Sequence, residues 1–345
     1  MAFAVRIDSL IPLCIQICST KQQRRHHFRR NMSSICSIAR KEKKICQSLA
    51  GLRDLAQSGQ YKAWLLDQFG VLHDGQRPYP GAVATLEQLA HSGAKMVIVS
   101  NSSRRAWTTM EKVQKLGFDA SLFVGAITSG ELTHQNLLRR NDPWFAALGR
   151  CCIHMTWSER GAISLEGLGL QIVEHLEDAD FILAHGTEAI GLENDRGLKP
   201  MKLEELEEIL EHAVDRAIPM IVANPDHVTV EARALRVMPG TLGSRYEQIG
   251  GQVRWMGKPD QVIYKAAMEM TGVDAADCIA VGDSLHHDIL GANNSGMQSV
   301  FVTGGIHADE LGISQFGMVP EVAAIEALSH SYGAYSSYSI PSFAW

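Results

Sequence analysis

The chain has 345 residues, of which 46% are apolar and 20% are charged, a composition typical of about two soluble globular domains. No uninterrupted apolar run approaches the roughly 18 residues that a membrane-spanning helix needs, so the sequence predicts no membrane span. Residues 1–44 hold ten of the 32 basic and two of the 38 acidic residues, which leaves 22 basic against 36 acidic, a net charge of −14, for the rest. An acidic body repels nucleic acid, so we expect a small-molecule substrate.

Residues 1–50 are expected to form a basic leader. An apolar stretch at residues 7–18 is combined with Arg- and Ser-rich sequence that has almost no acids, which is the composition of an organelle transit peptide. A transit peptide would place the protein in a mitochondrion or a plastid. A disordered basic tail on a cytoplasmic protein is an equal alternative, because a start at Met32 would remove most of the signal.

Short β-like runs then alternate with helical patterns along the chain. Strands are expected at residues 63–66, 95–99, 151–155, 181–184, 219–223, 278–281 and 299–302. Helices are expected at residues 81–91, 104–116, 203–215 and 261–270, where apolar residues recur at spacings of three and four. The alternation and the continuous apolar runs predict an α/β fold with a doubly wound parallel sheet. Residues 329–345 are Ser- and Tyr-rich and are expected to be a loosely ordered tail.

Polar side chains follow three of these β-like runs and one further short stretch, Trp255-Met256-Gly257. They are Asp67, then Ser100 with Asn101, then Lys258, and finally Asp283 with Asp288 five positions later. In an open α/β sheet the carboxyl ends of the strands meet at one edge, so these groups are expected to share a crevice. An isolated aspartate at a strand end is more often a helix cap or a turn former, and only the ordered set indicates a site.

The set has a chemical purpose. A carboxylate that attacks an anionic phosphoryl group must overcome charge repulsion, which a divalent cation and a lysine relieve. Asp67 and Asp283 would bind Mg²⁺ through hard oxygen ligands, and Lys258 would neutralise charge on the nucleophile and the substrate. Ser100 would bind the transferring oxygens, and Asp288 would orient Lys258 or the waters of the metal.

These residues resemble the four signature motifs of the haloacid-dehalogenase-like (HAD) hydrolase superfamily, from residue 62 to about residue 306. Asp67-Gln68-Phe69-Gly70-Val71-Leu72 resembles the first motif, Ser100-Asn101 the second, Lys258-Pro259 the third, and Gly282-Asp283 with Asp288 the fourth. The resemblance implies a Rossmann-like core, here residues 51–125 and 245–328, and an α/β cap domain inserted at residues 126–244. It also implies Mg²⁺ as cofactor, Asn101 as a phosphate-binding residue, and a metal contact from the backbone carbonyl of Phe69.

The stretch Ala223-Asn224-Pro225-Asp226 resembles the class IIA subgroup, which includes phosphatases of nucleotides and sugar phosphates. The resemblance implies that Asn224 and Asp226 lie near the substrate. An ordinary Asn-Pro turn after a strand explains the same residues equally well. The identity of the phosphorylated metabolite and the oligomeric state do not follow from the sequence.

One position departs from the family pattern. Family phosphatases carry a second aspartate two residues after the nucleophile as general acid and base, and this chain has Phe69 there. Loss of a general acid or base typically lowers the rate by about 10² to 10⁴. Phe69 therefore keeps two alternatives open: a protein that binds a phosphorylated ligand or a protein partner with little turnover, and a dehalogenase-like hydrolase, whose leaving group needs no proton. Asp283 and Asp288 favour the phosphatase, because a metal-free dehalogenase needs no cation site.

His73 and Asp74 follow the first motif and precede Gly75. One hypothesis is that either residue replaces the missing acid and base from a short flap. The simpler interpretation is a tight turn, since Asp-Gly is a common turn sequence.

Overall fold

The computed structural model of the chain describes residues 46–231 and 234–345. Most of the predicted leader lies in residues 1–45, outside this range, and its targeting role stays a prediction. Within the described residues, none of the helices has the length and apolarity to cross a membrane.

The first of two large sheets has seven strands, all parallel. In spatial order they are β1 (Gln47–Ser48), β16 (Tyr338–Ile340), β15 (Gln298–Val302), β14 (Cys278–Gly282), β2 (Ala63–Leu66), β3 (Lys95–Ser100) and β4 (Phe123–Thr128). The four residues of β2 are all buried, as the continuous apolar run predicts for a strand covered on both faces. The predicted doubly wound parallel sheet is thereby confirmed.

Alternate residues of these strands enter two hydrophobic clusters, one on each face of the sheet. Trp64 and Leu66 of β2 pack with α2 (Arg53–Gln57), α3 (Ala82–His91) and α4 (Ala106–Lys115). Ala63 and Leu65 pack on the other face with α5 (Ser129–Arg139), α9 (Gln261–Thr271) and α10 (Leu290–Asn294). The sheet is therefore the middle layer of three, with helices on both faces.

The second large sheet lies in the stretch between β4 and α9, as expected for an inserted cap. Its path is β13 (Val253–Trp255), β10 (Met220–Val222), β7 (Phe181–Ala184), β5 (Cys151–Thr156), β8 (Ala189–Gly191) and β9 (Leu198–Pro200), and β6 (Gln171–Ile172) also pairs with β5. Helices α7 (Leu203–Asp215) and α8 (Pro239–Gln248) cover one face, and α6 (Pro143–Ala147) packs on the other. A hairpin of β11 (Val228–Glu231) and β12 (Ala234–Val237) follows β10.

The structure moves the predicted domain boundaries. The first sheet includes all of β4, which the predicted cut between residues 125 and 126 divides. The predicted core segment from residue 245 onward contains β13, yet this strand pairs with β10 of the second sheet. The apolar pattern shows that a strand is buried but not which sheet it joins, so the boundaries required the tertiary structure.

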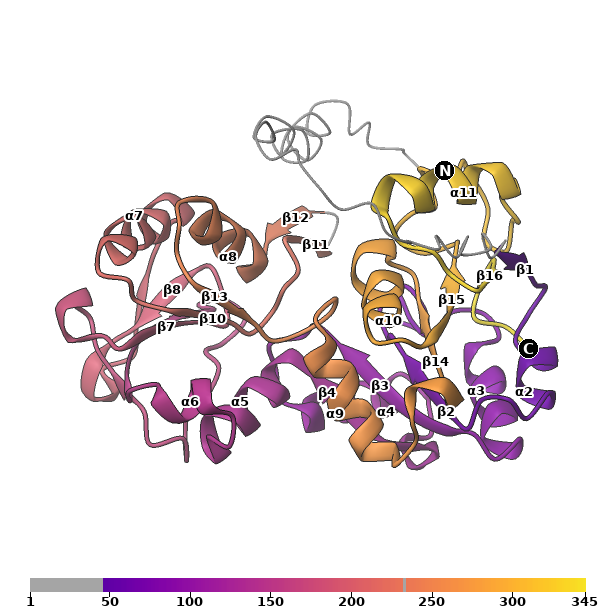
Figure 1. Cartoon of the computed structure of the whole chain (residues 1–345), viewed down its shortest axis with the longest axis horizontal. Coiled ribbons are helices and arrows are strands. Elements are labelled where there is room, and N and C mark those ends of the chain that lie inside the picture. The colour runs from indigo at the N-terminus through magenta and orange to yellow at the C-terminus, as the bar shows by residue number, and fades with distance from the viewer. Residues whose placement is uncertain (1–45, 232–233) are drawn as a thin grey trace, which may run out of the picture. The chain divides into compact units, whose positions relative to one another are not determined.

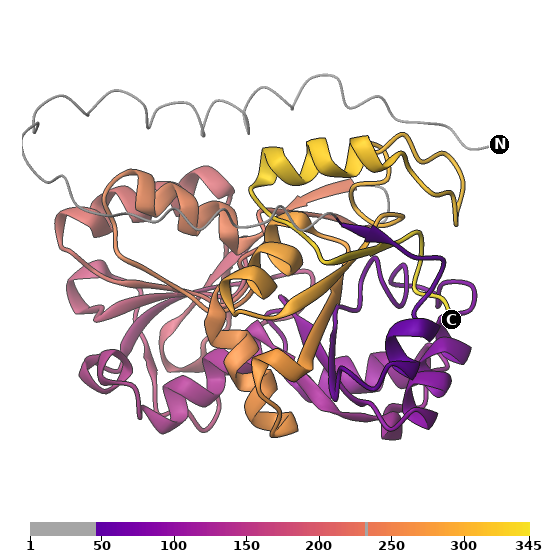
Figure 2. The same cartoon turned by 45° about the vertical axis from the view of Figure 1, so that its right-hand side comes forward.

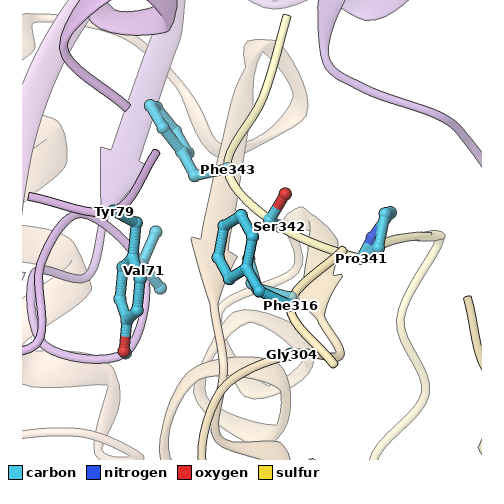
Figure 3. Close-up of a pocket in the computed structure, with 9 residues that line it drawn as sticks. Val71, Tyr79, Gly304, Phe316, Pro341, Ser342 and Phe343 are labelled. Atoms are coloured by element: carbon cyan, nitrogen blue, oxygen red, sulfur yellow. The ribbon is translucent and has the colours of Figure 1, made fainter. Parts of the chain in front are cut away.

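The prediction of a loosely ordered tail at residues 329–345 is wrong. Helix α11 (Val322–Tyr332) runs into this segment, and β16 then pairs with β15 inside the first sheet. Ile340 and Phe343 are 1% exposed, and Phe343 joins the cluster beneath β2. In Figure 3 the chain at Pro341, Ser342 and Phe343 passes beside the rings of Tyr79 and Phe316. Pairing and apolar burial order the tail despite its polar composition.

The end of the predicted leader is also part of the fold. The predicted leader includes residues 46–50, but Gln47 and Ser48 form β1 and pair in parallel with Tyr338 and Ser339. The two ends of the described chain therefore meet at one edge of the first sheet, where the indigo and yellow ribbons lie together in Figures 1 and 2. Two residues are too few for a sequence pattern to indicate a strand.

The remaining short turns of helix connect these elements. They are η2 (Ala120–Leu122), η3 (Leu176–Asp178), η4 (Glu193–Asp195), η5 (Ala275–Asp277) and the π-helical turn η6 (Leu285–Ile289). The last one begins three residues after β14 ends and contains Asp288, and π-helical turns are frequent at functional sites.

Candidate functional site

The candidate nucleophile Asp67 lies at the centre of the first sheet. It follows β2, and its backbone N–H donates to the carbonyl of Val281 on β14 at 2.9 Å. Ser100 closes β3 on one side of β2, and Asp283 follows β14 on the other. Three adjacent parallel strands thus deliver Asp67, Ser100 and Asp283 to the same edge, where open α/β sheets collect their reactive groups.

Lys258 connects two of the acids. Its ammonium Nζ donates to Oδ1 of Asp67 and to Oδ1 of Asp288, both at 2.7 Å, and the Lys258 side chain is 5% exposed. Lys258 comes from the loop between β13 and α9, so the contact closes over 191 residues of sequence. Buried charges are tolerated when they are paired and hydrogen-bonded, and this lysine meets both conditions.

Backbone amides bind the carboxylates of Asp283 and Asp288. The N–H of Ile306 donates to Oδ2 of Asp283 at 2.8 Å, and the N–H of Ser284 donates to Oδ2 of Asp288 at 3.0 Å. The backbone thereby orients both Asp283 and Asp288, and Lys258 holds the other oxygen of Asp288.

Glycines make room for Asp283. A Cβ on Gly70 would lie 1.9 Å from Oδ2 of Asp283, and one on Gly305 would lie 2.2 Å from the same atom. Gly70 also has φ of +85°, in the region that favours glycine. The first motif therefore needs Gly70 for space as well as for backbone conformation.

The three carboxylates form an unbalanced charge cluster. One oxygen from each of Asp67, Asp283 and Asp288 lies within 4.8 Å of the others. Burial raises the pKa of Asp67 to about 7, with Asp288 adding to the rise and Lys258 opposing it. Burial and the two neighbouring acids also raise the pKa of Asp283 well above its usual range. Three acids against one ammonium favour a bound cation, and a set of carboxylate oxygens fits a hard ion such as Mg²⁺.

The side chains of Gln68 and His73 form a hydrogen-bonded chain that ends at Ser100, which the sequence did not indicate. Gln68 donates from Nε2 to Oγ of Ser100 at 2.8 Å, and its Oε1 lies 3.3 Å from Nε2 of His73. His73 is 1% exposed, and burial lowers its pKa to about 4, so it is neutral at physiological pH. Gln68 lies next to the predicted nucleophile, but nothing in its residue type marks it as a support for Ser100.

His73 and Asp74 have partners in a turn. Nδ1 of His73 accepts the N–H of Gly75 at 3.0 Å, which leaves Nε2 as the protonated nitrogen that faces Gln68. Oδ1 of Asp74 accepts the N–H groups of Gln76 and Arg77 at 2.9 and 2.8 Å. These bonds match the turn interpretation, and the hypothesis that either residue replaces the missing acid stays a prediction.

The side chain of Asn101 holds the backbone of Lys258. Its Oδ1 accepts the N–H of Lys258 at 2.8 Å, and its Nδ2 donates to the carbonyl of Lys258 at 3.1 Å. The same Nδ2 donates to Oδ1 of Asp226 at 2.8 Å. The predicted phosphate contact of Asn101 stays a prediction, and the positioning of Lys258 is a role that sequence reasoning missed.

Asp226 reaches the site and Asn224 shapes the loop that carries it. Asn224 is 2% exposed, and its Oδ1 accepts the N–H of Asp226 at 2.9 Å, which is the turn that an Asn-Pro sequence favours. Oδ1 of Asp226 lies 3.7 Å from Nδ1 of His287. The segment therefore forms the turn that the simpler interpretation predicts, and it brings Asp226 into contact with Asn101. That Asn224 and Asp226 lie near the substrate stays a prediction.

Phe69 is the departure from the expected site. Its ring is 47% exposed and meets the imidazole of His73 edge-on, with ring centroids 6.2 Å apart. A large apolar side chain that stays half exposed beside a polar cluster is not part of the hydrophobic core.

Comparison with known proteins agrees with this architecture. Residues 64–171 match the family model described as haloacid dehalogenase-like hydrolase, and residues 255–321 match the model described as HAD-hydrolase-like. Chronophin from Bos taurus is 28% identical over 291 residues, which cover 80% of this chain and 94% of that protein. Acid sugar phosphatase from Staphylococcus aureus is 23% identical over 251 residues, with coverage of 72% and 88%. A crystal structure of a haloacid dehalogenase-like hydrolase from Brucella suis superimposes with a TM-score of 0.65 at 26% identity, covering 85% of this chain and 99% of that one.

Proposed function

The chain belongs to the haloacid dehalogenase-like hydrolases, and on that premise we propose that it is a phosphatase of small phosphorylated metabolites that works through an aspartyl-phosphate on Asp67. The observation that supports this most is the ammonium of Lys258, held at 2.7 Å from both Asp67 and Asp288. A relative that is 23% identical to this chain is named as an acid sugar phosphatase, which agrees with a phosphorylated substrate.

In the proposed reaction the carboxylate of Asp67 attacks phosphorus and the ester oxygen leaves. The buried ammonium of Lys258 reduces the repulsion between the carboxylate and the anionic phosphoryl group. The hydroxyl of Ser100 donates to a phosphoryl oxygen while Gln68 donates to Ser100, so the hydroxyl is oriented before the substrate arrives. Water then attacks the phosphorus of the aspartyl-phosphate, which releases phosphate and restores Asp67.

A magnesium ion is part of the proposal. Asp67 and Asp283 would bind it directly, with the backbone carbonyl of Phe69, and Asp288 would bind through water. When bound, the ion would supply positive charge that offsets the cluster of acids and the incoming phosphoryl group. Its fit is supported by three carboxylates, two buried and one partly buried, which share the single ammonium of Lys258 within the described part of the chain.

Two alternatives keep support from Phe69. A half-exposed ring two residues after Asp67 cannot transfer a proton, which favours a protein that binds a phosphorylated ligand with negligible turnover. The same ring would suit a dehalogenase-like reaction. The three-carboxylate cluster speaks against the second alternative, because such a reaction requires no cation.

The test is hydrolysis of a panel of phosphorylated metabolites by the purified chain with Mg²⁺, beside Asp67→Asn. Asp119→Asn is the matched control, because Asp119 is exposed and its carboxylate caps the short turn η2 through Ser121. We expect phosphate release that Asp67→Asn abolishes and Asp119→Asn retains. Thermal stabilisation by a panel member without phosphate release would instead indicate the binding protein. Halide release from a haloacid that persists after chelation of Mg²⁺ would indicate the dehalogenase.

A further inference from the structure

The leaving oxygen of a phosphate ester needs a proton unless it is stable as an anion. The conjugate acid of a phenolate has a pKa of about 10 and that of a carboxylate about 4, while water, a guide to a simple alkanol, has about 15.7. Departure of an alkoxide into a buried site is therefore slow without a proton donor, whereas an acidic phenol, an enol or a carboxylate can leave unaided. Which groups around Asp67 could donate a proton decides which esters the site can cleave.

The segment that follows Asp67 offers no free donor in the described structure. Phe69 has none. The Nε2–H of His73 faces Oε1 of Gln68, and its Nδ1 already accepts the N–H of Gly75. Oδ1 of Asp74 accepts the backbone N–H groups of Gln76 and Arg77 in its own turn.

Among the described residues, the polar side chains of the cap and of the third and fourth motifs near Asp67 are also bound to other groups or buried. Oδ1 of Asp226 accepts a hydrogen bond from Nδ2 of Asn101. Nδ1 of His287 lies 3.7 Å from Oδ1 of Asp226 and 3.3 Å from Oγ of Ser284. Nε2 of His287 has no hydrogen-bond partner among the described residues, but it is buried and so is not exposed to a substrate in the site. Lys258 already donates to two carboxylates, and an ammonium is a weak acid with an ordinary pKa near 10.4.

We propose that this site cleaves phosphate from leaving groups that depart as stable anions, namely aryl and enol phosphates and acyl phosphates, and that it discriminates against phosphate esters of simple alcohols. The proposal rests on the proposed phosphatase function and names its substrate class. Phe69 is the residue that sets the selectivity, because it occupies the position beside the nucleophile with a side chain that has no proton to give.

The chemistry balances without a further reactant. In the first step a carboxylate oxygen of Asp67 bonds to phosphorus, the bond from phosphorus to the ester oxygen breaks, and the leaving group takes the electron pair as an anion. In the second step water bonds to phosphorus and the carboxylate leaves, which restores Asp67. The two protons of that water remain on the phosphate or pass to solvent, so the net reaction is ester dianion plus water to leaving-group anion plus dihydrogen phosphate.

The experiment measures kcat/KM with Mg²⁺ for a series of aryl phosphates of graded phenol pKa, with glycerol phosphate as the alkyl ester. We expect the wild type to lose activity steeply as the leaving group becomes more basic. Phe69→Asp supplies a carboxyl group and should raise kcat/KM for glycerol phosphate by about 10² to 10⁴ while changing that for nitrophenyl phosphate far less. Phe69→Leu is the matched control, since it changes the packing without adding a proton and should keep the steep dependence.

Other results would overturn the proposal. A wild type that cleaves glycerol phosphate as readily as nitrophenyl phosphate has a proton donor, and a dependence that becomes steep only in Asp226→Asn or His287→Gln would locate it. Equal gains for both substrates in Phe69→Asp and Phe69→Leu would make Phe69 a steric residue. Failure of the underlying phosphatase function looks different, because no ester would be cleaved in an Asp67-dependent way by the wild type or by Phe69→Asp.

Discussion

Asn101 follows strand β3 of the first sheet, and Asp226 follows strand β10 of the second sheet. Nδ2 of Asn101 donates a hydrogen bond of 2.8 Å to Oδ1 of Asp226. Asn101 simultaneously binds the backbone N–H and carbonyl of Lys258. One amide group therefore links the second sheet to the lysine that contacts the candidate nucleophile.

We expect Asn101→Ala to lower kcat/KM far more than Asp226→Ala. The first change removes both bonds that hold the backbone of Lys258 and leaves buried groups unpaired, at about 1–3 kcal/mol each, whereas the second removes a single partner. Because about 1.4 kcal/mol is tenfold, Asn101→Ala should cost about 10² or more and Asp226→Ala about tenfold. Steady-state kinetics on the preferred ester measure both. Equal losses would mean that the link to the second sheet, rather than the position of Lys258, carries the effect.

Gly70→Ala should damage the cation site beyond the strain of its backbone. Its Cβ would lie 1.9 Å from Oδ2 of Asp283, at a φ of +85°. Gly81→Ala is the control, because Gly81 has φ of +81° and open space around a Cβ. Both variants should lose about 1–2 kcal/mol to the backbone conformation. Only Gly70→Ala should also lose Mg²⁺ binding, measured by calorimetric titration, and retention of wild-type affinity there would contradict the proposed role of Asp283.

Removal of Mg²⁺ and removal of a carboxylate should have opposite effects on stability. The crowded acids repel one another in the metal-free protein, so Asp283→Asn is expected to be more stable than the wild type in the presence of a chelator. With Mg²⁺ at about 100 times Kd the wild type should gain about 2.7 kcal/mol, and Asp283→Asn should gain little.

Thermal unfolding of the wild type and of Asp283→Asn, with chelator and with saturating Mg²⁺, measures these changes in stability. Glu111→Gln removes an exposed acid from α4 and should follow the wild type in both conditions. Equal stabilisation of Asp283→Asn and the wild type by Mg²⁺ would remove Asp283 from the ligand set.

The second sheet should weaken in mild acid through a buried histidine pair. Nε2 of His154 lies 3.1 Å from Nδ1 of His185. Burial lowers the pKa of His154 to about 4, and burial together with the neighbouring His154 lowers the pKa of His185 well below its usual value. Between pH 6.5, near the pKa of an unfolded histidine, and pH 4, the unfolded chain binds protons that the folded chain does not bind. Stability therefore falls as the pH falls through this range.

For His154 alone the loss approaches about 3 kcal/mol at the acid end of that window, and above pH 6.5 the effect vanishes. Urea unfolding from pH 7 to pH 4 measures it. His154→Gln keeps a hydrogen-bonding side chain without the titration and should reduce the slope with pH, so an unchanged slope would assign the acid sensitivity to other groups.

Phe343→Ala should destabilise the first-sheet domain by about 3–5 kcal/mol, because the ring is 1% exposed within the cluster beneath β2. Leu138→Ala, at a side chain that is 55% exposed, is the control and should change stability by less than about 0.5 kcal/mol. Urea denaturation measures both. A loss for Phe343→Ala no larger than the control would show that the last segment does not contribute to the core.

The sequence by itself determined the α/β fold and most of the site. Continuous apolar runs identified β2, β3 and β14 to within a residue or two, and polar residues at their ends indicated Asp67, Ser100 and Asp283. Such residues are predictable because burial on both faces imposes an apolar run, and because parallel strands in one sheet must end at a common edge.

Tertiary structure alone decided what those side chains touch and where the domains divide. The contact of Lys258 with Asp288, the link from Gln68 to Ser100 and the hold of Asn101 on Lys258 depend on distances between segments far apart in the chain, which no local pattern encodes. The same holds for β13 and β16, because the sheet that each strand joins depends on which neighbouring strand, β10 or β15, has an edge free to pair with it. Local propensity acts over a few residues, whereas sheet membership and side-chain pairing are settled by the packing of the whole chain.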